Sequence, residues 1–171
     1  MRETVDRHQR LADRHRFVFE AEAESLPGQW DGQRLGRVLD NLLGNAMKYS
    51  PEGGLISVRV GRGQRPASQH PGDRALMDAT DHASNCTGVL LSVEDHGIGI
   101  PGDDLPHVFE RFHRGANVPQ TVVGSGIGLT SVAQIVHQHG GQITIASEVG
   151  RGTRVTIWLP LRTAALTEMG Q

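Results

Sequence analysis

Apolar residues recur at three- and four-residue intervals in two stretches of the chain, and this spacing predicts two amphipathic helices. The first is expected to begin after Asp31, a suitable N-terminal cap, and to end at the Ser-Pro pair at residues 50–51. The second covers residues 129–136 and stops at the His-Gly-Gly sequence 139–141. A polar segment over residues 3–15 predicts a helical lead-in.

Runs of β-forming residues predict strands between and after these helices. They lie around Phe17 and Phe19 and over residues 55–60, 88–94, 142–147 and 153–159. Because the strands come in adjacent pairs and the helices are interspersed, we expect an α+β fold. Its sheet should be mixed and mostly antiparallel, with helices packed on one face.

Two segments carry no regular pattern. Residues 61–87 are rich in Gly, Arg, Gln, Ser, His and Asp and have hardly any apolar anchors, which predicts a mobile insertion because such a segment cannot offset its ordering entropy. Residues 96–124 form an irregular stretch marked by glycine and proline.

Composition narrows the class of protein. The 171 residues suit one domain, and 17 Lys and Arg against 19 Asp and Glu give a net charge of −2, so we expect no contact with nucleic acid or membrane by this chain. Cys86 is the only cysteine, which favours a reducing, cytoplasmic compartment. Tethering to a membrane through a missing segment or a partner stays open.

Polar side chains follow one flank of the first long helix. Asn41, Asn45 and Lys48 are spaced by four and three residues, so they share a flank beside the apolar stripe. Two amide oxygens and an ammonium suit a hydrated Mg²⁺ ion and phosphate oxygens. An ordinary solvated helix face explains the flank equally well, so from the helix alone both interpretations remain.

Two glycine-marked bends are further candidates for ligand contact. Asp95 follows a strand and begins the sequence DHGIGIP, in which the backbone can turn sharply and the carboxylate can accept a hydrogen bond from an amine. Residues 124–128 (GSGIG) precede the second helix, whose free N–H groups attract anions. Taken singly, each bend is also a common turn, and neither the Walker nor the Rossmann context is present.

The combination of motifs is much more specific than its parts. An Asn-x-x-x-Asn helix is followed in order by DHGIGIP, VFERFHRG, GSGIGLTSV and HGGQITIASEVGRGTRVTIWLP. Over residues 16–160 this series closely resembles the catalytic domain of bacterial sensor histidine kinases, with its N box, two glycine boxes and phenylalanine box. The resemblance implies the Bergerat-type two-layer α/β sandwich shared with gyrase and mismatch-repair ATPases.

The resemblance also implies a role for each matching residue. Asn45 would coordinate Mg²⁺, Asn41 would assist it, Lys48 would neutralise phosphate charge and Asp95 would bind the adenine amino group. Residues 102–123 would be a mobile lid over ATP, anchored by Phe109 and Phe112. The implied ATP-binding set is Asn45, Lys48, Tyr49, Asp95, Gly97, Ile98, Gly99, Phe109, Arg111, Phe112, Arg114, Gly124, Ser125, Gly126, Gly128, Leu129 and Thr153.

Asn41 separates the functions that this fold supports. Hydrolytic relatives and serine kinases resemble one another in carrying a carboxylate there, which acts as general base, whereas a neutral histidine acceptor already offers a lone pair. We therefore expect a protein-histidine kinase module that uses ATP and Mg²⁺. A self-contained ATPase or serine kinase, or an ATP-sensing module without transfer, is the alternative.

The acceptor histidine is not expected within the chain. Neither His8 nor His15 is followed by the residues that the family places after its acceptor. The partners implied are a dimerisation domain or protein carrying the target histidine, and a response regulator downstream. The chain would then be an excised domain or half of a split kinase, with a lead-in at 1–15, a catalytic domain at 16–162 and a flexible tail at 163–171.

Overall fold

The computed structural model describes residues 1–23, 26, 28–66, 87–119, 122 and 124–161. These residues form four helical segments and five strands. In order they are α1 (Arg2–Leu11), β1 (His15–Ala21), α2 (Gly32–Lys48), β2 (Gly54–Gln64), β3 (Thr87–Glu94), the 3-10 helix η1 (Gly102–His107), α4 (Gly128–Gln138), β4 (Gln142–Glu148) and β5 (Gly152–Pro160).

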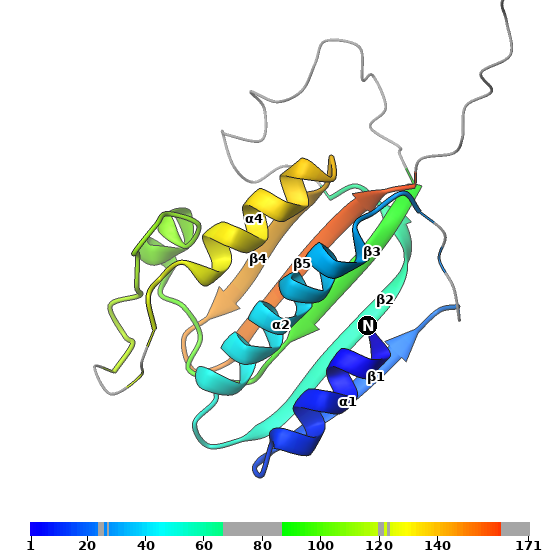
Figure 1. Cartoon of the computed structure of the whole chain (residues 1–171). Coiled ribbons are helices and arrows are strands. Elements are labelled where there is room, and N and C mark those ends of the chain that lie inside the picture. The colour runs from blue at the N-terminus through cyan, green and yellow to red at the C-terminus, as the bar shows by residue number, and fades with distance from the viewer. Residues whose placement is uncertain (24–25, 27, 67–86, 120–121, 123, 162–171) are drawn as a thin grey trace, which may run out of the picture.

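The five strands form one mixed sheet in the order β1-β2-β3-β5-β4. Strand β1 pairs with β2 in parallel, and the other three pairings are antiparallel. Helices α1, α2 and α4 all cover the same face of this sheet (Figure 1). The α+β architecture predicted from the order of elements is therefore confirmed.

The core lies between this face and the helices. Helix α2 begins where the sequence predicts, because the Asp31 carboxylate accepts from the N–H groups of Gln33 at 2.9 Å and Arg34 at 3.0 Å. The Arg34 contact also holds the pKa of Asp31 below its ordinary value. The apolar stripe of α2 is buried against the sheet and α4, with Val38, Leu39 and Leu43 essentially inaccessible.

Helix α1 is shorter than the predicted lead-in. It ends at Leu11, Ala12 is extended, and the chain enters β1 at His15 rather than continuing as helix. The Gln9 side chain then pairs with the edge of β1: its Nε2 donates to the His15 carbonyl at 3.1 Å, and its Oε1 accepts from the Phe17 N–H at 2.7 Å. These two hydrogen bonds imitate a neighbouring strand at an edge that would otherwise be unpaired.

The prediction of an insertion over 61–87 was wrong at both ends. Residues 61–64 continue β2, and Thr87 begins β3, with Gly61 opposite Leu90 and Gln64 opposite Thr87. A polar composition does not prevent strand formation here, because the antiparallel ladder satisfies the backbone whatever the side chains are. Residues 67–86 of the predicted insertion lie outside the described part of the chain.

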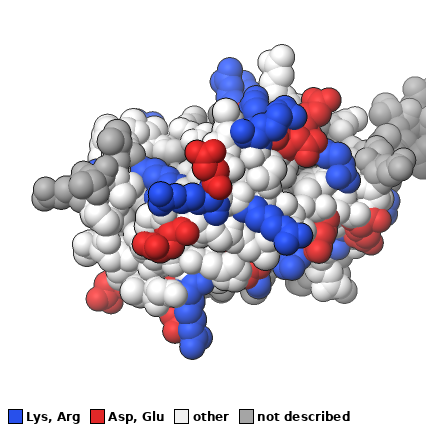
Figure 2. Space-filling view, turned by 90° about the horizontal axis from the view of Figure 1, so that it is seen from below, with Lys and Arg blue, Asp and Glu red and all other residues white. Residues whose placement is uncertain are grey.

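The sheet face away from the helices carries a row of charged side chains. Arg59 contacts Glu20 at 2.9 Å and Glu94 at 3.5 Å, and Arg154 contacts Glu94 at 2.6 Å, so opposite charges alternate across four strands. Viewed from below, the molecule also shows basic and acidic side chains interspersed (Figure 2). Among the described residues, no helix is both long and apolar enough to cross a bilayer.

Candidate functional site

Two adjoining cavities lie where α2, β3, β5 and the start of α4 meet the segment that follows β3. The first, here called the Asp95 cavity, also has Thr153 and Ile98 in its wall. The second, the Lys48 cavity, is bordered by the residues that precede α4. They have five lining residues in common, so the two cavities adjoin: Asn45, Tyr49, Val108, His113 and Leu129.

Asp95 is held in place by backbone groups on either side of its cavity. One carboxylate oxygen, Oδ1, accepts from the N–H of Gly97 at 2.9 Å and from the N–H of Thr153 at 3.2 Å. The backbones of Asp95 and Thr153 also exchange two hydrogen bonds, at 2.9 and 3.2 Å. The second oxygen makes no hydrogen bond among the described residues, so it can accept one from an amine in the cavity.

Burial dominates the electrostatics of this carboxyl group. Asp95 is only 8% exposed, and desolvation raises its pKa above the ordinary value. The N–H groups of Gly97 and Thr153 oppose the rise, since they stabilise the charged form. An acceptor in such surroundings interacts strongly with a donor that enters the cavity, because little water competes.

The bend after Asp95 is fixed by contacts to two other segments, the end of α2 and the turn between β4 and β5. The N–H of Ile98 donates to the Tyr49 carbonyl at 2.9 Å, and the Ile98 carbonyl accepts from Gly150 at 2.9 Å. Gly99 has a φ of +68°, and a Cβ there would lie 2.0 Å from the Glu148 carbonyl oxygen. Glycine is therefore required at this position, which explains the second glycine of the motif.

The remaining wall of the Asp95 cavity is apolar. It includes Val93 from β3, Val155 from β5, Ile145 from β4 and Leu42 and Ala46 from α2. These residues also belong to, or pack against, the core beneath. A flat ring that carries an amine would bury its faces here while the amine reaches Asp95, as expected for adenine.

The Lys48 cavity is polar and carries positive charge. It is lined by Asn41, Asn45 and Lys48, as the spacing on α2 predicts. The Lys48 ammonium lies 3.2 Å from the Tyr49 hydroxyl and 4.7 Å from its ring centroid, which holds the cation near the shared wall. Among the described residues that line this cavity none is acidic, so it suits an anion.

The glycine-rich loop completes the Lys48 cavity by allowing close approach. A Cβ on Gly124 would lie 2.1 Å from Lys48 Nζ, and one on Gly128 would lie 3.2 Å from Asn41 Oδ1. Helix α4 begins at Gly128 without a side-chain cap, so the N–H groups of its first turn face the loop end of the site. Such a helix start attracts phosphate oxygens.

The structure brings together most of the predicted site residues. Those that line one or both cavities are Asn41, Asn45, Lys48, Tyr49, Asp95, Ile98, Gly99, Arg114, Gly124, Ser125, Gly126, Gly128, Leu129 and Thr153. Gly97 lines neither cavity but holds Asp95, and Phe109 packs against the core. The positions of these residues are therefore known, whereas the contacts that each makes with a ligand stay predictions.

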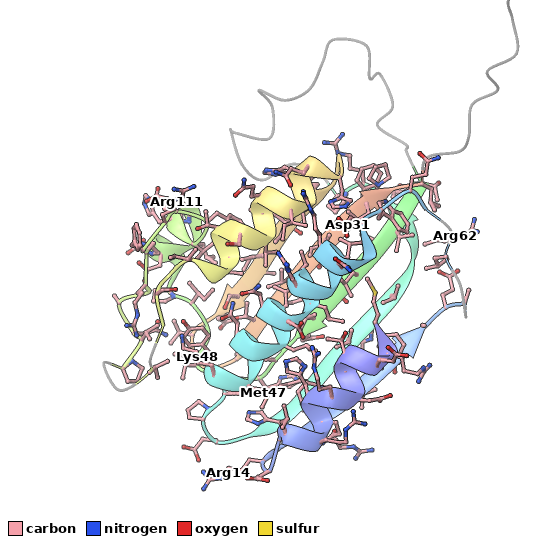
Figure 3. The ribbon with its side chains drawn as sticks, in the orientation of Figure 1. Arg14, Asp31, Met47, Lys48, Arg62 and Arg111 are labelled. Carbon is pink, nitrogen blue, oxygen red and sulfur yellow. The ribbon has the colours of Figure 1, made fainter. Side chains whose placement is uncertain are left out.

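Besides Gly97 and Phe109, two further predicted residues, Arg111 and Phe112, line neither cavity. Arg111 lies on the outer side of the segment after η1, away from Lys48 (Figure 3). Phe112 is 70% exposed, so the prediction that it anchors the lid was wrong. Its φ of +66° and the hydrogen bond from its N–H to the Gly126 carbonyl turn the ring outward, and Phe109 alone packs inward.

Several lining residues were absent from the predicted set. His113, Gly115, Asn117 and Val118 come from the segment between η1 and α4 and line the Asp95 cavity. All four lie in the predicted lid 102–123, and the resemblance named His113 with Arg111 and Arg114 as residues near the phosphates, but the sequence does not show which lid residues face the Asp95 cavity. The apolar wall residues were predicted only as core, because a strand pattern does not distinguish the floor of a cavity from a packed interior.

Comparison with known proteins agrees with this geometry. Residues 30–163 match the family described as histidine kinase-, DNA gyrase B- and HSP90-like ATPase, and the chain belongs to that family. The sensor histidine kinase WalK of Bacillus subtilis is 31% identical over 160 residues, which are 92% of this chain and 23% of WalK. The chain thus spans less than a quarter of that relative.

Solved structures of histidine kinases also match this chain. A mycobacterial sensor histidine kinase, MprB, matches with a TM-score of 0.66 and 30% identity over 93% of this chain and 91% of that one. The full-length kinase ShkA, solved in complex with AMPPNP, matches with a TM-score of 0.62 and 24% identity over 96% of this chain and 30% of that chain, which supports the fold alone. The chain is the ATP-binding catalytic module of sensor histidine kinases.

Proposed function

We propose that this module transfers the γ-phosphate of ATP, bound with Mg²⁺, to a histidine supplied by another segment or another polypeptide. A lone pair on the acceptor imidazole forms the new N–P bond, and the bond between the γ-phosphorus and the bridging oxygen breaks. ADP leaves with that electron pair. A response regulator would then receive the phosphate from the histidine.

The proposal is supported by the lack of a carboxylate among the described residues that line the Lys48 cavity. Asn41 lines it one helical turn before Asn45, and its Nδ2 donates to the Arg37 carbonyl at 2.9 Å. An amide cannot accept a proton from water or serine, and no described residue that lines this cavity is acidic. A neutral imidazole needs no such base, so positioning and charge neutralisation are enough.

The residues present fit a magnesium–triphosphate complex. The amide oxygen of Asn45, with assistance from Asn41, would be a hard ligand for Mg²⁺, which keeps most of its waters and phosphate ligands. Lys48 and the start of α4 would neutralise phosphate oxygens. Asp95 would receive the adenine amino group, while Tyr49 and Leu129 in the shared wall would lie along the ribose.

The positions of His8 and His15 near the N-terminus support a phosphate acceptor outside this chain. His8 Nδ1 is 3.0 Å from the Thr4 carbonyl oxygen, and His15 Nε2 is 2.9 Å from the Ser50 carbonyl oxygen. Helix α1, which carries His8, lies on the other side of α2 from α4 and η1 (Figure 1). Neither imidazole is directed at the Lys48 cavity.

Phosphotransfer is the direct test. The chain, mixed with its phosphoacceptor hairpin and labelled ATP·Mg, should place acid-labile, base-stable phosphate on the hairpin, while the isolated chain should release negligible phosphate. Asn45→Ala should lower transfer at least 100-fold, because charge neutralisation at the phosphates supplies several kcal/mol. Gln33→Ala, at an exposed position of the same helix, should leave transfer unchanged.

Each alternative has its own outcome. Steady phosphate release by the chain alone would indicate a self-contained ATPase. ATP binding without transfer to a verified hairpin would indicate an ATP-sensing module. Acid-stable phosphate on serine would indicate a serine kinase.

A further inference from the structure

The side chain of Asn117 joins the loop between η1 and α4 to the bend that follows Asp95. Asn117 lines the Asp95 cavity, and its Nδ2 donates to the Gly99 carbonyl at 2.9 Å. Gly99 also lines the cavity and lies 18 positions earlier in the chain, so this hydrogen bond joins two distant segments of the cavity wall.

The acceptor of this hydrogen bond belongs to a rigid element. Besides the contacts of Ile98 to Tyr49 and Gly150, the N–H of Ile100 donates to Ser147 Oγ at 2.9 Å. Ile98 and Ile100 are thus hydrogen-bonded to other parts of the molecule, and Gly99 between them has no room for a side chain. Asn117 therefore anchors a surface loop to a fixed point beside Asp95.

A second carboxylate shapes the loop that presents Asn117. Asp104 Oδ2, from η1, accepts from the Ala116 N–H at 2.8 Å, and Asp104 Oδ1 lies 3.3 Å from His113 Nε2. A Cβ on Gly115 would lie 3.1 Å from Asn117 Oδ1 and 3.4 Å from Asp104 Oδ2, so the loop is tightly folded around these groups. Asp104 thus fixes residues 113–117 in the orientation that the Gly99 contact requires.

From these contacts we infer that Asn117 is a positioning residue that holds the loop of residues 113–118 on the adenine-side bend and sets how long a nucleotide stays bound. The inference rests on the proposed function, since it concerns the same site. Lid residues His113, Gly115 and Val118 line the cavity together with Asn117. A nucleotide whose base lies beside Asp95 is released only when this loop lifts, and lifting breaks the hydrogen bond to Gly99.

The test is the dissociation rate of a fluorescent ATP analogue, measured by stopped-flow chase with excess ATP·Mg. Asn117→Asp keeps the size of the side chain and removes the donor, and Asn117→Ala removes the whole contact. Each variant should release the analogue about five- to tenfold faster, as loss of one hydrogen bond predicts, with an association rate within about twofold of the wild type. Ala116→Ser, at an exposed neighbouring position, should match the wild type.

The outcomes separate this inference from the proposed function. Wild-type dissociation rates in both Asn117 variants would overturn the role of Asn117 and leave ATP binding intact. Equal acceleration by Ala116→Ser would also overturn it, because loop disturbance in general would then be the cause. Failure of the wild-type chain to bind the analogue would instead overturn the proposed function. Melting temperatures of the nucleotide-free variants should fall by only the few degrees that loss of one hydrogen bond predicts, whereas a merely structural role would lower them without a change in the dissociation rate.

Discussion

At the scale of single residues, Asp95 shows a conflict between stability and binding. Its carboxylate is buried to receive a ligand, and burial raises its pKa because the charged form loses hydration. The two N–H groups from Gly97 and Thr153 offset only part of that cost. The site therefore keeps a charge that the folded chain would be more stable without.

Asp95→Asn should separate the two effects. The amide removes the buried charge, so the nucleotide-free variant should melt at a higher temperature than the wild type. ATP binding should weaken roughly ten- to a hundredfold, because the amide NH₂ would face the adenine amine donor to donor. Calorimetry and thermal unfolding measure the two quantities, and a loss of both stability and affinity would show that Asp95 is mainly structural.

The same carboxyl group predicts a pH dependence. Since its pKa is raised in the folded state, the stability that Asp95 contributes is greatest below the ordinary value of about 3.9 and is lost as the pH rises through the raised value. ATP affinity should change in the opposite sense and fall as the pH drops through that value, since the protonated group is a poorer acceptor. Asp95→Asn should lack this step in titrations of ATP affinity.

At the scale of elements, α1 protects the edge of the sheet. Val5 is its one buried residue, and Gln9 supplies the two hydrogen bonds to β1. The adjacent Arg7 and His8 approach Asp40, beside Asn41 on α2. The helix therefore depends on a few polar contacts for its position.

Gln9→Ala should weaken this attachment. Removal of two hydrogen bonds from the edge of β1 should lower the free energy of unfolding by about 1–2 kcal/mol. Arg10→Ala is the matched control, since it makes the same change at the next, exposed position of α1. Denaturant titration measures both, and equal losses in the two variants would mean that helix propensity rather than edge pairing is responsible.

The elements that could be predicted are those with strong periodicity. Helix α2 and its polar flank were predicted because a helix of known period fixes the relative directions of Asn41, Asn45 and Lys48. The end of β2 was missed, since the register between β2 and β3 depends on pairing across the sheet. Phe112 was expected to anchor the lid because the family resemblance implies it, whereas its backbone conformation turns the ring outward.

At the scale of the whole molecule, the site lies on the core. Val93, Val155 and Leu42 belong to the cluster that joins the sheet to α2, and they also form the wall of the Asp95 cavity. A ligand there contacts both layers of the fold. Its binding energy therefore stabilises the entire folded state rather than a single loop.

Nucleotide and metal should consequently act together on thermal unfolding. ATP·Mg at about 100 times its Kd should stabilise the chain by about 2.7 kcal/mol. Mg²⁺ alone should have no effect, because among the described residues no group of three or more His, Cys, Asp or Glu side chains could hold a metal ion. Chelation of Mg²⁺ should remove part of the ATP effect, and a clear shift with Mg²⁺ alone would contradict this picture.

The sequence by itself determined the helical flank, the two glycine bends and the order of elements, because each depends on local geometry or on residue types that tolerate particular backbone conformations. Only the tertiary structure decided that Asp95 and Lys48 border adjoining cavities, that Arg111 and Phe112 turn away, and that Asn117 reaches Gly99. These are relations between segments far apart in the chain. They arise when the sheet, the helices and the loop pack together, and no local spacing encodes that packing.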